Sequence, residues 1–173
     1  MAIKGKAYIK TTWAYQERPV ASQKLNTWDD RMEAALELVH FFLSMAWGGG
    51  DGVIRNATDD DLEVVATDPP SLSVEVKPGY GFVSGFPYKL EAATETVDVT
   101  PPTGNPRIDL VQARLETWDV SIKTGAEAAS PVAPDPDADC MGLAELYLRV
   151  GMTSIKNFDD ATNGYIIDAR TFV

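Results

Sequence analysis

Apolar and polar residues alternate along residues 71–90, and this segment organises the prediction for the rest of the chain. Every second residue is apolar over 72–76, and a second alternation runs over 80–90. Period-two patterning predicts strands with one buried face. The interrupting pairs Pro78-Gly79 and Ser84-Gly85 predict turns between them. We therefore predict short antiparallel strands in this segment.

The same patterning continues to the end of the chain. Residues 107–116 carry apolar side chains on both faces, which is typical of a central strand, and residues 118–123 are placed to pair with them as a hairpin. Val97 and Val99 indicate a further short strand. More strands are predicted at the positions 62–66, 141–150, 152–155 and 165–170. Short strands with frequent turn signals indicate an antiparallel β-sandwich or flattened barrel.

A helical period replaces the alternation nearer the N-terminus. One α-helix is predicted over residues 28–46, with Asn26 or Thr27 as its cap and the glycines at 48–50 as its stop. We predict three parts of the chain: an extended N-terminal arm (1–27), a helix with a glycine-rich hinge (28–50) and a β domain (51–173).

Apolar residues of this helix recur at alternating intervals of three and four, which is the spacing of a coiled-coil seam. The seam comprises Leu25, Trp28, Met32, Ala35, Val39, Phe42 and Ala46. A second stripe with similar spacing lies on another face and comprises Ala34, Leu38, Phe41 and Met45. Each of the two apolar faces must be buried against other protein, so we predict that the seam is an interface between copies of the chain. The alternative is one broad surface that faces the core of a monomer.

Three large aromatic residues of the arm, Tyr8, Trp13 and Tyr15, lack enough apolar neighbours to form a core of their own. Burial of such side chains is favourable and dominates many interfaces. We expect them to dock either on the body of the domain or on another subunit.

Composition narrows the classes of partner. The net charge of −11 disfavours a nucleic-acid partner, because phosphate contacts need clustered Lys and Arg. The longest apolar run, near residues 39–47, is too short to span a bilayer, so we expect no membrane partner. A single cysteine, Cys140, excludes an internal disulfide. Asp135, Asp137 and Asp139 have the alternate spacing of a calcium loop but lack its glycine and its closing glutamate. We expect no metal and no cofactor.

The sequence contains few reactive side chains that could act in catalysis. His40 is the only histidine and lies on the polar strip of the predicted helix, and nothing places Cys140 near a base. The glycines at 48–52 lack the Lys-Ser/Thr of a phosphate loop. We therefore predict no catalytic residues and no enzyme activity. Four aromatic residues are of the kind that stacks on sugars, although in alternating strands they are more often core: Tyr80, Tyr88, Trp118 and Tyr147.

Two features together resemble tailed-bacteriophage virion proteins. The first is Thr12-Trp13 followed by Val20-Ala21-Ser22-Gln23-Lys24-Leu25-Asn26 and a helix, which is similar to the lead-in of many tail-fibre, baseplate and head-fibre proteins. The second is an ordered series similar to an N-terminal β domain of baseplate and receptor-binding proteins. It includes Val74-x-Val76-x-Pro78-Gly79, Asn105-Pro106-Arg107-Ile108-Asp109, Leu143-Ala144-Glu145-Leu146, and the closing Ile155, Ile167, Asp168 and Arg170.

The resemblance covers about residues 12–170 and implies a structural role without a reaction. It implies an adaptor or connector of the tail baseplate or tail fibre, located in the virion and assembled in the host bacterial cytoplasm. Such domains usually precede a shaft or receptor-binding head and this chain stops at Val173, so a connector is expected rather than a host-binding protein. The implied partners are other copies in a homotrimer and other virion proteins of the tail, baseplate or capsid. A head-fibre or capsid-decoration protein, and a carbohydrate-binding module for a host glycan, are the alternatives.

Overall fold

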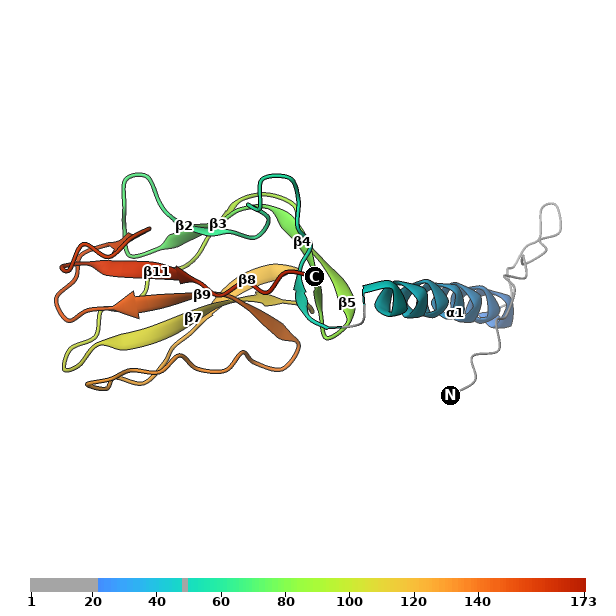
Figure 1. Ribbon diagram of the computed structural model, residues 1–173. Coiled ribbons are helices and arrows are strands. Elements are labelled where there is room, and N and C mark those ends of the chain that lie inside the picture. Colours follow the sequence, from blue (N-terminus) through green and yellow to red (C-terminus); the bar gives the residue numbers. More distant parts are fainter. Residues whose placement is uncertain (1–21, 48–49) are drawn as a thin grey trace. The chain divides into compact units, whose positions relative to one another are not determined.

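The computed structural model describes residues 22–47 and 50–173, and the chain divides into two compact units, residues 1–49 and 50–173 (Figure 1). The described part of the first unit is a helix, and the second unit is built from strands. Most of the predicted arm, residues 1–21, lies outside the described residues.

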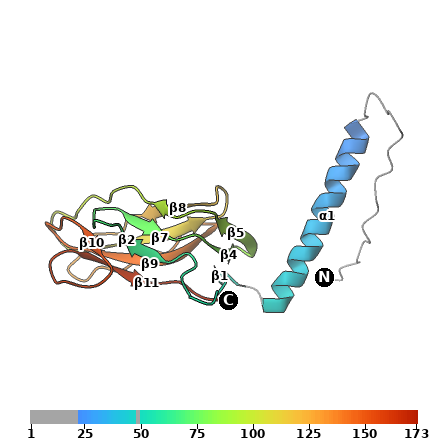
Figure 2. The same ribbon diagram turned by 90° about the horizontal axis from the view of Figure 1, so that it is seen from above.

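The helix α1 (Ser22–Trp47) is one continuous element (Figures 1 and 2). It begins at Ser22 rather than at Trp28, so Asn26 and Thr27 lie inside it. The Thr27 hydroxyl donates a hydrogen bond to the carbonyl oxygen of Gln23, 2.8 Å away, which is the behaviour of a threonine within a helix. The predicted cap is therefore wrong, and residues 22–27 belong to the helix rather than to the arm. The end at Trp47, directly before the glycines, confirms the predicted stop.

The second unit contains three sheets around one hydrophobic core. The first sheet has the order β1 (Gly52–Val53), β4 (Gly79–Val83), β5 (Phe86–Leu90). The second has the order β10 (Ile155–Lys156), β11 (Gly164–Asp168), β9 (Cys140–Leu148), β7 (Arg107–Arg114), β8 (Asp119–Lys123). The third has the order β2 (Val64–Ala66), β3 (Val74–Val76), β6 (Thr94–Glu95). Neighbouring strands are antiparallel except for β10 and β11, which are parallel, and one sheet is curled into a half-barrel. The predicted mainly β fold with one N-terminal helix is confirmed.

The organising segment forms β3, β4 and β5, as its alternation predicts. β4 and β5 make a hairpin in which Val83 pairs with Phe86 across Ser84 and Gly85. Both turn residues have positive φ, 51° and 76°, which is the conformation of a two-residue turn that matches the twist of the flanking strands. Farther along, β6 ends at Glu95 and Val97 is exposed, so the strand predicted at Val97 and Val99 is wrong.

β7 is the central strand of the five-stranded sheet and pairs with β9 on one side and β8 on the other. All of its residues are buried except Arg114. This confirms the prediction from apolar residues on both faces of the segment. The fully buried side chains of the core come from several sheets and loops and include Val53, Leu62, Val74, Val76, Val83, Tyr88, Val111, Ala113, Leu143, Ala144, Leu146, Leu148 and Ile155.

Two of the β7 residues form a buried ion pair. The Arg107 guanidinium donates to both carboxylate oxygens of Asp109, at 2.7 and 2.9 Å, because residues two apart on a strand share a face. Arg107 also donates to the carbonyl oxygen of Thr100, and Asp109 accepts from the backbone N–H of Gly125. Both charges are therefore satisfied by hydrogen bonds, and the pair connects the loop before β7 with the loop after β8.

A second carboxylate secures the loop before β7. Glu127 accepts hydrogen bonds from the backbone N–H groups of Thr103, Gly104 and Asn105, at 3.0, 2.9 and 3.1 Å. These three donors stabilise the charged form and hold the pKa of Glu127 below its ordinary value. The proline-rich loop predicted from sequence is thus tied to a residue more than twenty positions away.

The C-terminal residues close the unit against its first strand. The backbone N–H of Val53 donates to Thr171, and the N–H of Val173 donates to the carbonyl oxygen of Val53, at 2.7 and 3.1 Å. Arg170 forms a two-bond pair with Asp168, and its guanidinium also donates to the carbonyl oxygen of Asp61, 2.8 Å away. The last strand and the loop before β2 are therefore held together.

Candidate functional site

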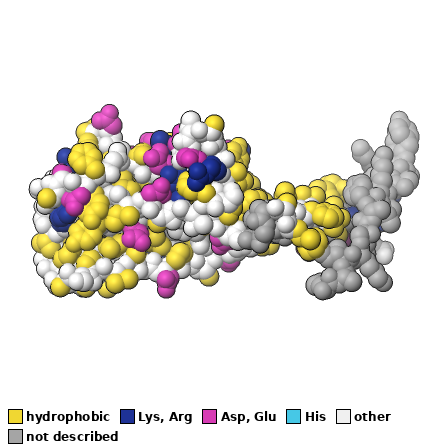
Figure 3. Space-filling view, in the orientation of Figure 1, with side chains coloured by type: hydrophobic (Ala, Val, Ile, Leu, Met, Phe, Trp, Pro, Cys, Tyr) yellow, Lys and Arg dark blue, Asp and Glu magenta, His cyan; other side chains and the backbone are white. Residues whose placement is uncertain are grey.

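The exposed surface of α1 is the strongest candidate for a functional site. Eight of its large apolar side chains are 41–66% exposed, and Figure 3 shows hydrophobic atoms over much of the visible helix surface. The exposed set is Leu25, Trp28, Met32, Leu36, Val39, Phe42, Leu43 and Met45. No described helix residue belongs to the buried core cluster of the strand unit. The described apolar side chains of the helix therefore belong to its surface and not to a buried core cluster.

The apolar surface extends around most of the helix. At about 100° per residue, the apolar side chains between Phe41 and Leu36 span an arc of roughly 220°, which in the first half of the helix also holds Lys24, Thr27 and Arg31. The remaining strip is acidic in the first half of the helix and contains Asp29, Asp30, Glu33 and Glu37. A helix that is apolar over most of its circumference is stable when other protein covers it.

The structure places the predicted seam on a single helix, as its spacing requires. Six of its seven residues are exposed, and Ala35 is half-buried. Leu36 and Leu43 add to this surface and were not predicted as interface residues. They occupy the heptad position directly after Ala35 and Phe42, which flanks a coiled-coil seam. A search for flanking apolar residues, rather than for the three-four spacing alone, would have found them.

The polar strip of the helix is only partly described. His40 and Ser44 lie in α1, but their side chains are outside the described part of the chain. Residues 38–47 contain no Asp, Glu, Lys or Arg, so the second half of the helix is more apolar than the first. Within residues 22–47 and 50–173, no helix combines the length and apolarity needed to cross a membrane.

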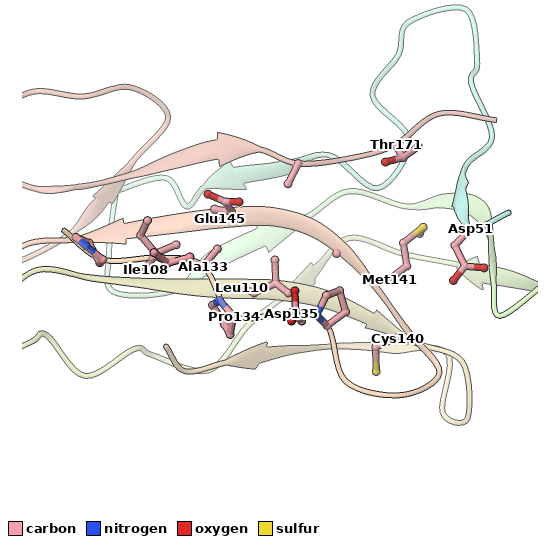
Figure 4. Close-up of a pocket in the computed structure, with 15 residues that line it drawn as sticks. Asp51, Ile108, Leu110, Ala133, Pro134, Asp135, Cys140, Met141, Glu145 and Thr171 are labelled. Carbon is pink, nitrogen blue, oxygen red and sulfur yellow. The ribbon is translucent and has the colours of Figure 1, made fainter. Parts of the chain in front are cut away.

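The strand unit carries a shallow groove of about 680 Å³ beside the loop formed by residues 131–136. Its lining includes the carboxylates of Asp51, Asp135 and Glu145, and the thiol of Cys140 (Figure 4). Glu145 and Cys140 point in opposite directions from the sheet. Burial raises the pKa of the Cys140 thiol above its ordinary value, so the thiol is protonated at neutral pH. This arrangement does not assemble an activated nucleophile with a neighbouring base.

Of the three aspartates that resemble a calcium loop, Asp137 instead anchors the loop to β7 and β8. Asp137 accepts from the Lys123 ammonium and from the Gln112 amide, each at 2.7 Å, and these contacts lower its pKa. Its backbone N–H donates to the same Gln112 side chain, 2.9 Å away. In the described ranges, no group of three or more His, Cys, Asp or Glu side chains is arranged to hold a metal ion.

Two of the four aromatic candidates for sugar stacking are engaged within the fold. Tyr88 is buried and donates its hydroxyl to the carbonyl oxygen of Asp119, at 2.8 Å. The Tyr147 ring stacks on Tyr165 at 5.2 Å, and the Arg149 guanidinium lies 5.2 and 5.1 Å from the two ring centres. The other two candidates, Tyr80 and Trp118, are half-exposed.

The residues predicted to dock the arm, Tyr8, Trp13 and Tyr15, lie outside the described residues, so their role stays a prediction. Comparison with known proteins gives no relative: no family model, curated protein or solved structure matches the chain. The exposed helix and the sequence resemblance therefore carry the functional proposal.

Proposed function

We propose that this protein is a structural component of a bacteriophage virion, an adaptor or connector of the tail baseplate or tail fibre, which assembles as a homotrimer through α1. The observation that carries the proposal is the exposed apolar surface of the helix. Exposed apolar patches larger than a few hundred Å² are uncommon on monomers and usually mark an interaction surface. The seam spacing favours other copies of the same helix as the cover.

Association through the seam has a clear energetic basis. Val39 and Phe42 are 55% and 61% exposed in the single chain, and each fully buried Val or Phe side chain contributes about 1.5–3 kcal/mol. Parallel packing of identical helices buries each seam residue against its equivalents, so the gain repeats along the helix. The threefold symmetry comes from the resemblance to phage fibres and adaptors. The residues of the seam, including Trp28 and Met32, do not follow the Ile/Leu rules that separate dimers from trimers.

The ion pairs of the strand unit support a structural role. The sequence motifs that resemble phage baseplate domains include Arg107 with Asp109 and Asp168 with Arg170. Each pair is joined by two hydrogen bonds between guanidinium and carboxylate. Such pairs impose geometry on the chain. These motif residues therefore serve the fold of the unit and need no reaction to explain them.

The location is tested by imaging virions of the phage that encodes this chain. A gold-labelled antibody against the protein is applied to purified virions and viewed in negative stain. Label at the baseplate or tail fibre is the expected result. Label on the capsid would favour the head-fibre or capsid-decoration alternative. Virions that lack the protein altogether would contradict the proposal.

A further inference from the structure

We propose that copies of α1 pack in parallel through a graded interface, which is broad over residues 36–46 and narrow over residues 22–35. The proposal rests on the proposed function, because it describes how the self-association takes place. The intervals of the seam assign Leu25 to heptad position a and Trp28 to d, and the pattern continues to Ala46 at a. Positions e and g flank the seam on its two sides, so their residues decide how wide the contact is.

The flanking positions are apolar in the second half of the helix. Leu36 and Leu43 occupy position e and are exposed in the single chain. Leu38 and Met45, from the second stripe, occupy position g, where Met45 is exposed and Leu38 is half-buried. At about 100° per residue, the apolar arc from Met45 to Leu36 spans roughly 180°. An arc of this width is typical of a helix that faces the core of a bundle, not of a narrow two-helix seam.

The flanking positions are charged in the first half of the helix. Position g holds Lys24 and Arg31, and position e holds Asp29. The apolar arc between these charges, from Ala35 to Leu25, spans only roughly 80° and is confined to the seam. Burying the charged groups that border this arc would be unfavourable, so the contact between copies does not widen in this half.

The residues at e and g are complementary between parallel copies. In a parallel bundle, position g of one helix lies beside position e of the following heptad on its neighbour. This arrangement brings Lys24 towards Asp29 of the neighbouring copy, so opposite charges meet in the first half. It also brings Leu38 towards Leu43 of the neighbouring copy, so apolar side chains meet in the second half. Both halves of the helix are therefore matched to themselves.

An antiparallel arrangement lacks this match. When two antiparallel seams coincide along their whole length, position g faces position g, which brings Lys24 towards Met45 and Arg31 towards Leu38 of the other copy. Both basic residues then lie beside apolar side chains. The parallel arrangement leaves one such contact, Arg31 beside Leu36, where the aliphatic stem of the arginine can pack against the leucine. The charges of the helix therefore favour parallel copies.

A graded interface gives the bundle two unlike ends. The strand unit begins at residue 50, directly after α1 in every copy, so parallel packing gathers the strand units at the end where the contact is broad. Local opening costs least where the fewest apolar side chains are buried, so the N-terminal ends of the helices separate most readily. A connector built in this way holds its strand units together while its opposite end opens.

Amide hydrogen exchange of the unmodified full-length protein tests the gradient. Mass spectrometry compares peptides from residues 22–35 and 36–46, corrected for their intrinsic exchange rates, while light scattering reports the trimer separately. We expect exchange at least about tenfold slower in the second half, because exchange follows the free energy of local opening. Equal exchange in the two halves of a trimer would overturn the gradient and leave the proposed function standing. A monomer at every concentration would contradict both.

Substitution of the flanking leucines tests the broad half directly. The test variant carries Leu36→Gln and Leu43→Gln, which keep the helix propensity and remove apolar surface at e. The control carries Asn26→Gln and Ala34→Gln, at positions b and c, which face away from the seam. Sedimentation equilibrium should show association weakened at least about hundredfold in the test variant and within about threefold of the unmodified protein in the control. Equal association of all three proteins would overturn the proposal. If circular dichroism shows that the test variant has lost its helix, the exchange gradient of the unmodified protein decides.

Single cysteines test the orientation in a Cys140→Ser background. Leu25→Cys and Ala46→Cys lie at position a near opposite ends of the helix, and Asp30→Cys, at the outward position f, is the control. Parallel copies bring each seam cysteine within disulfide reach of its own equivalent, so mild oxidation should link chains in both seam variants and not in the control. An oligomer of unchanged mass in which neither seam variant forms a link would overturn the parallel arrangement.

Discussion

Replacement of Val39 and Phe42 with Asp is expected to dissociate the trimer without unfolding the strand unit. Both side chains lie on the seam and more than half of each is exposed in the single chain. Full burial of such a side chain contributes about 1.5–3 kcal/mol, so hiding the exposed half contributes about 1–1.5 kcal/mol. Six such side chains in a trimer amount to about 6–9 kcal/mol.

The corresponding loss of affinity is large. At about 1.4 kcal/mol per factor of ten, the lost burial alone weakens the trimer by about 10⁴–10⁶-fold. The new carboxylates add to this, because burying an unpaired charge is strongly unfavourable. Sedimentation equilibrium should therefore show trimers for the unmodified protein and monomers for the variant at the same micromolar concentration.

A matched control separates this effect from added charge. Val97→Asp with Val132→Asp makes the same change at two valines of the strand unit that are 78% and 80% exposed. The control should remain trimeric, and far-ultraviolet circular dichroism should show the same β signal in all three proteins. Persistence of the trimer in the seam variant, or equal dissociation of the control, would refute the role of the seam.

Three further predictions concern the strand unit. Arg107→Met leaves Asp109 buried without its partner and should lower the free energy of unfolding by about 3–5 kcal/mol in chemical denaturation. Arg114→Met, at an exposed pair, should lower the free energy of unfolding much less. Similar losses in the two variants would contradict the importance of burial. Glu127→Gln should lower the free energy of unfolding at neutral pH, because the lowered pKa of Glu127 in the folded state means that its charged form stabilises the fold. The difference in the free energy of unfolding between variant and unmodified protein should shrink as the pH falls below the ordinary pKa of 4.5, where protonation removes this stabilisation. A difference that does not change with pH would contradict this prediction. Gly125→Ala would place Cβ 2.0 Å from the carbonyl oxygen of Ile108 and should cost at least about 3 kcal/mol, while Gly142→Ala, with its nearest atom at 3.4 Å, should be tolerated.

Local pattern predicted the strands well because strand pairing depends on which face each side chain occupies. The apolar residues on both faces of residues 107–116 correctly indicated the central position of β7. The pairing of β4 with β5 followed from the alternation and the turn residues Ser84 and Gly85. In these elements the information lies within a few residues of the strand itself.

The start of the helix was less predictable because cap residues can also lie inside helices. Asn26 and Thr27 are frequent caps, but Thr27 hydrogen-bonds to the previous turn at Gln23 and the helix continues back to Ser22. The three-four spacing likewise identified the seam but not Leu36, which flanks it. A search for the three-four spacing alone omits apolar residues at the heptad positions that flank the seam.

Contacts between distant segments could not be predicted from local pattern. The Arg170 guanidinium donates to the carbonyl oxygen of Asp61, 109 residues earlier in the chain. Glu127 likewise binds backbone N–H groups more than twenty residues before it. These partners are brought together only when the sheets have packed, because no sequence period relates them. The same holds for the loop contact between Asp137 and Gln112.

The mass of the unmodified protein in solution tests the central claim most directly, that the exposed helix is an interface between copies. Light scattering coupled to size exclusion, repeated over a wide concentration range, measures this mass without any label or substitution. The proposed trimer predicts about 56 kDa, three times the 18.8 kDa of one chain. A constant dimer mass would retain self-association but contradict threefold symmetry. A mass of 18.8 kDa at every concentration would contradict the claim itself.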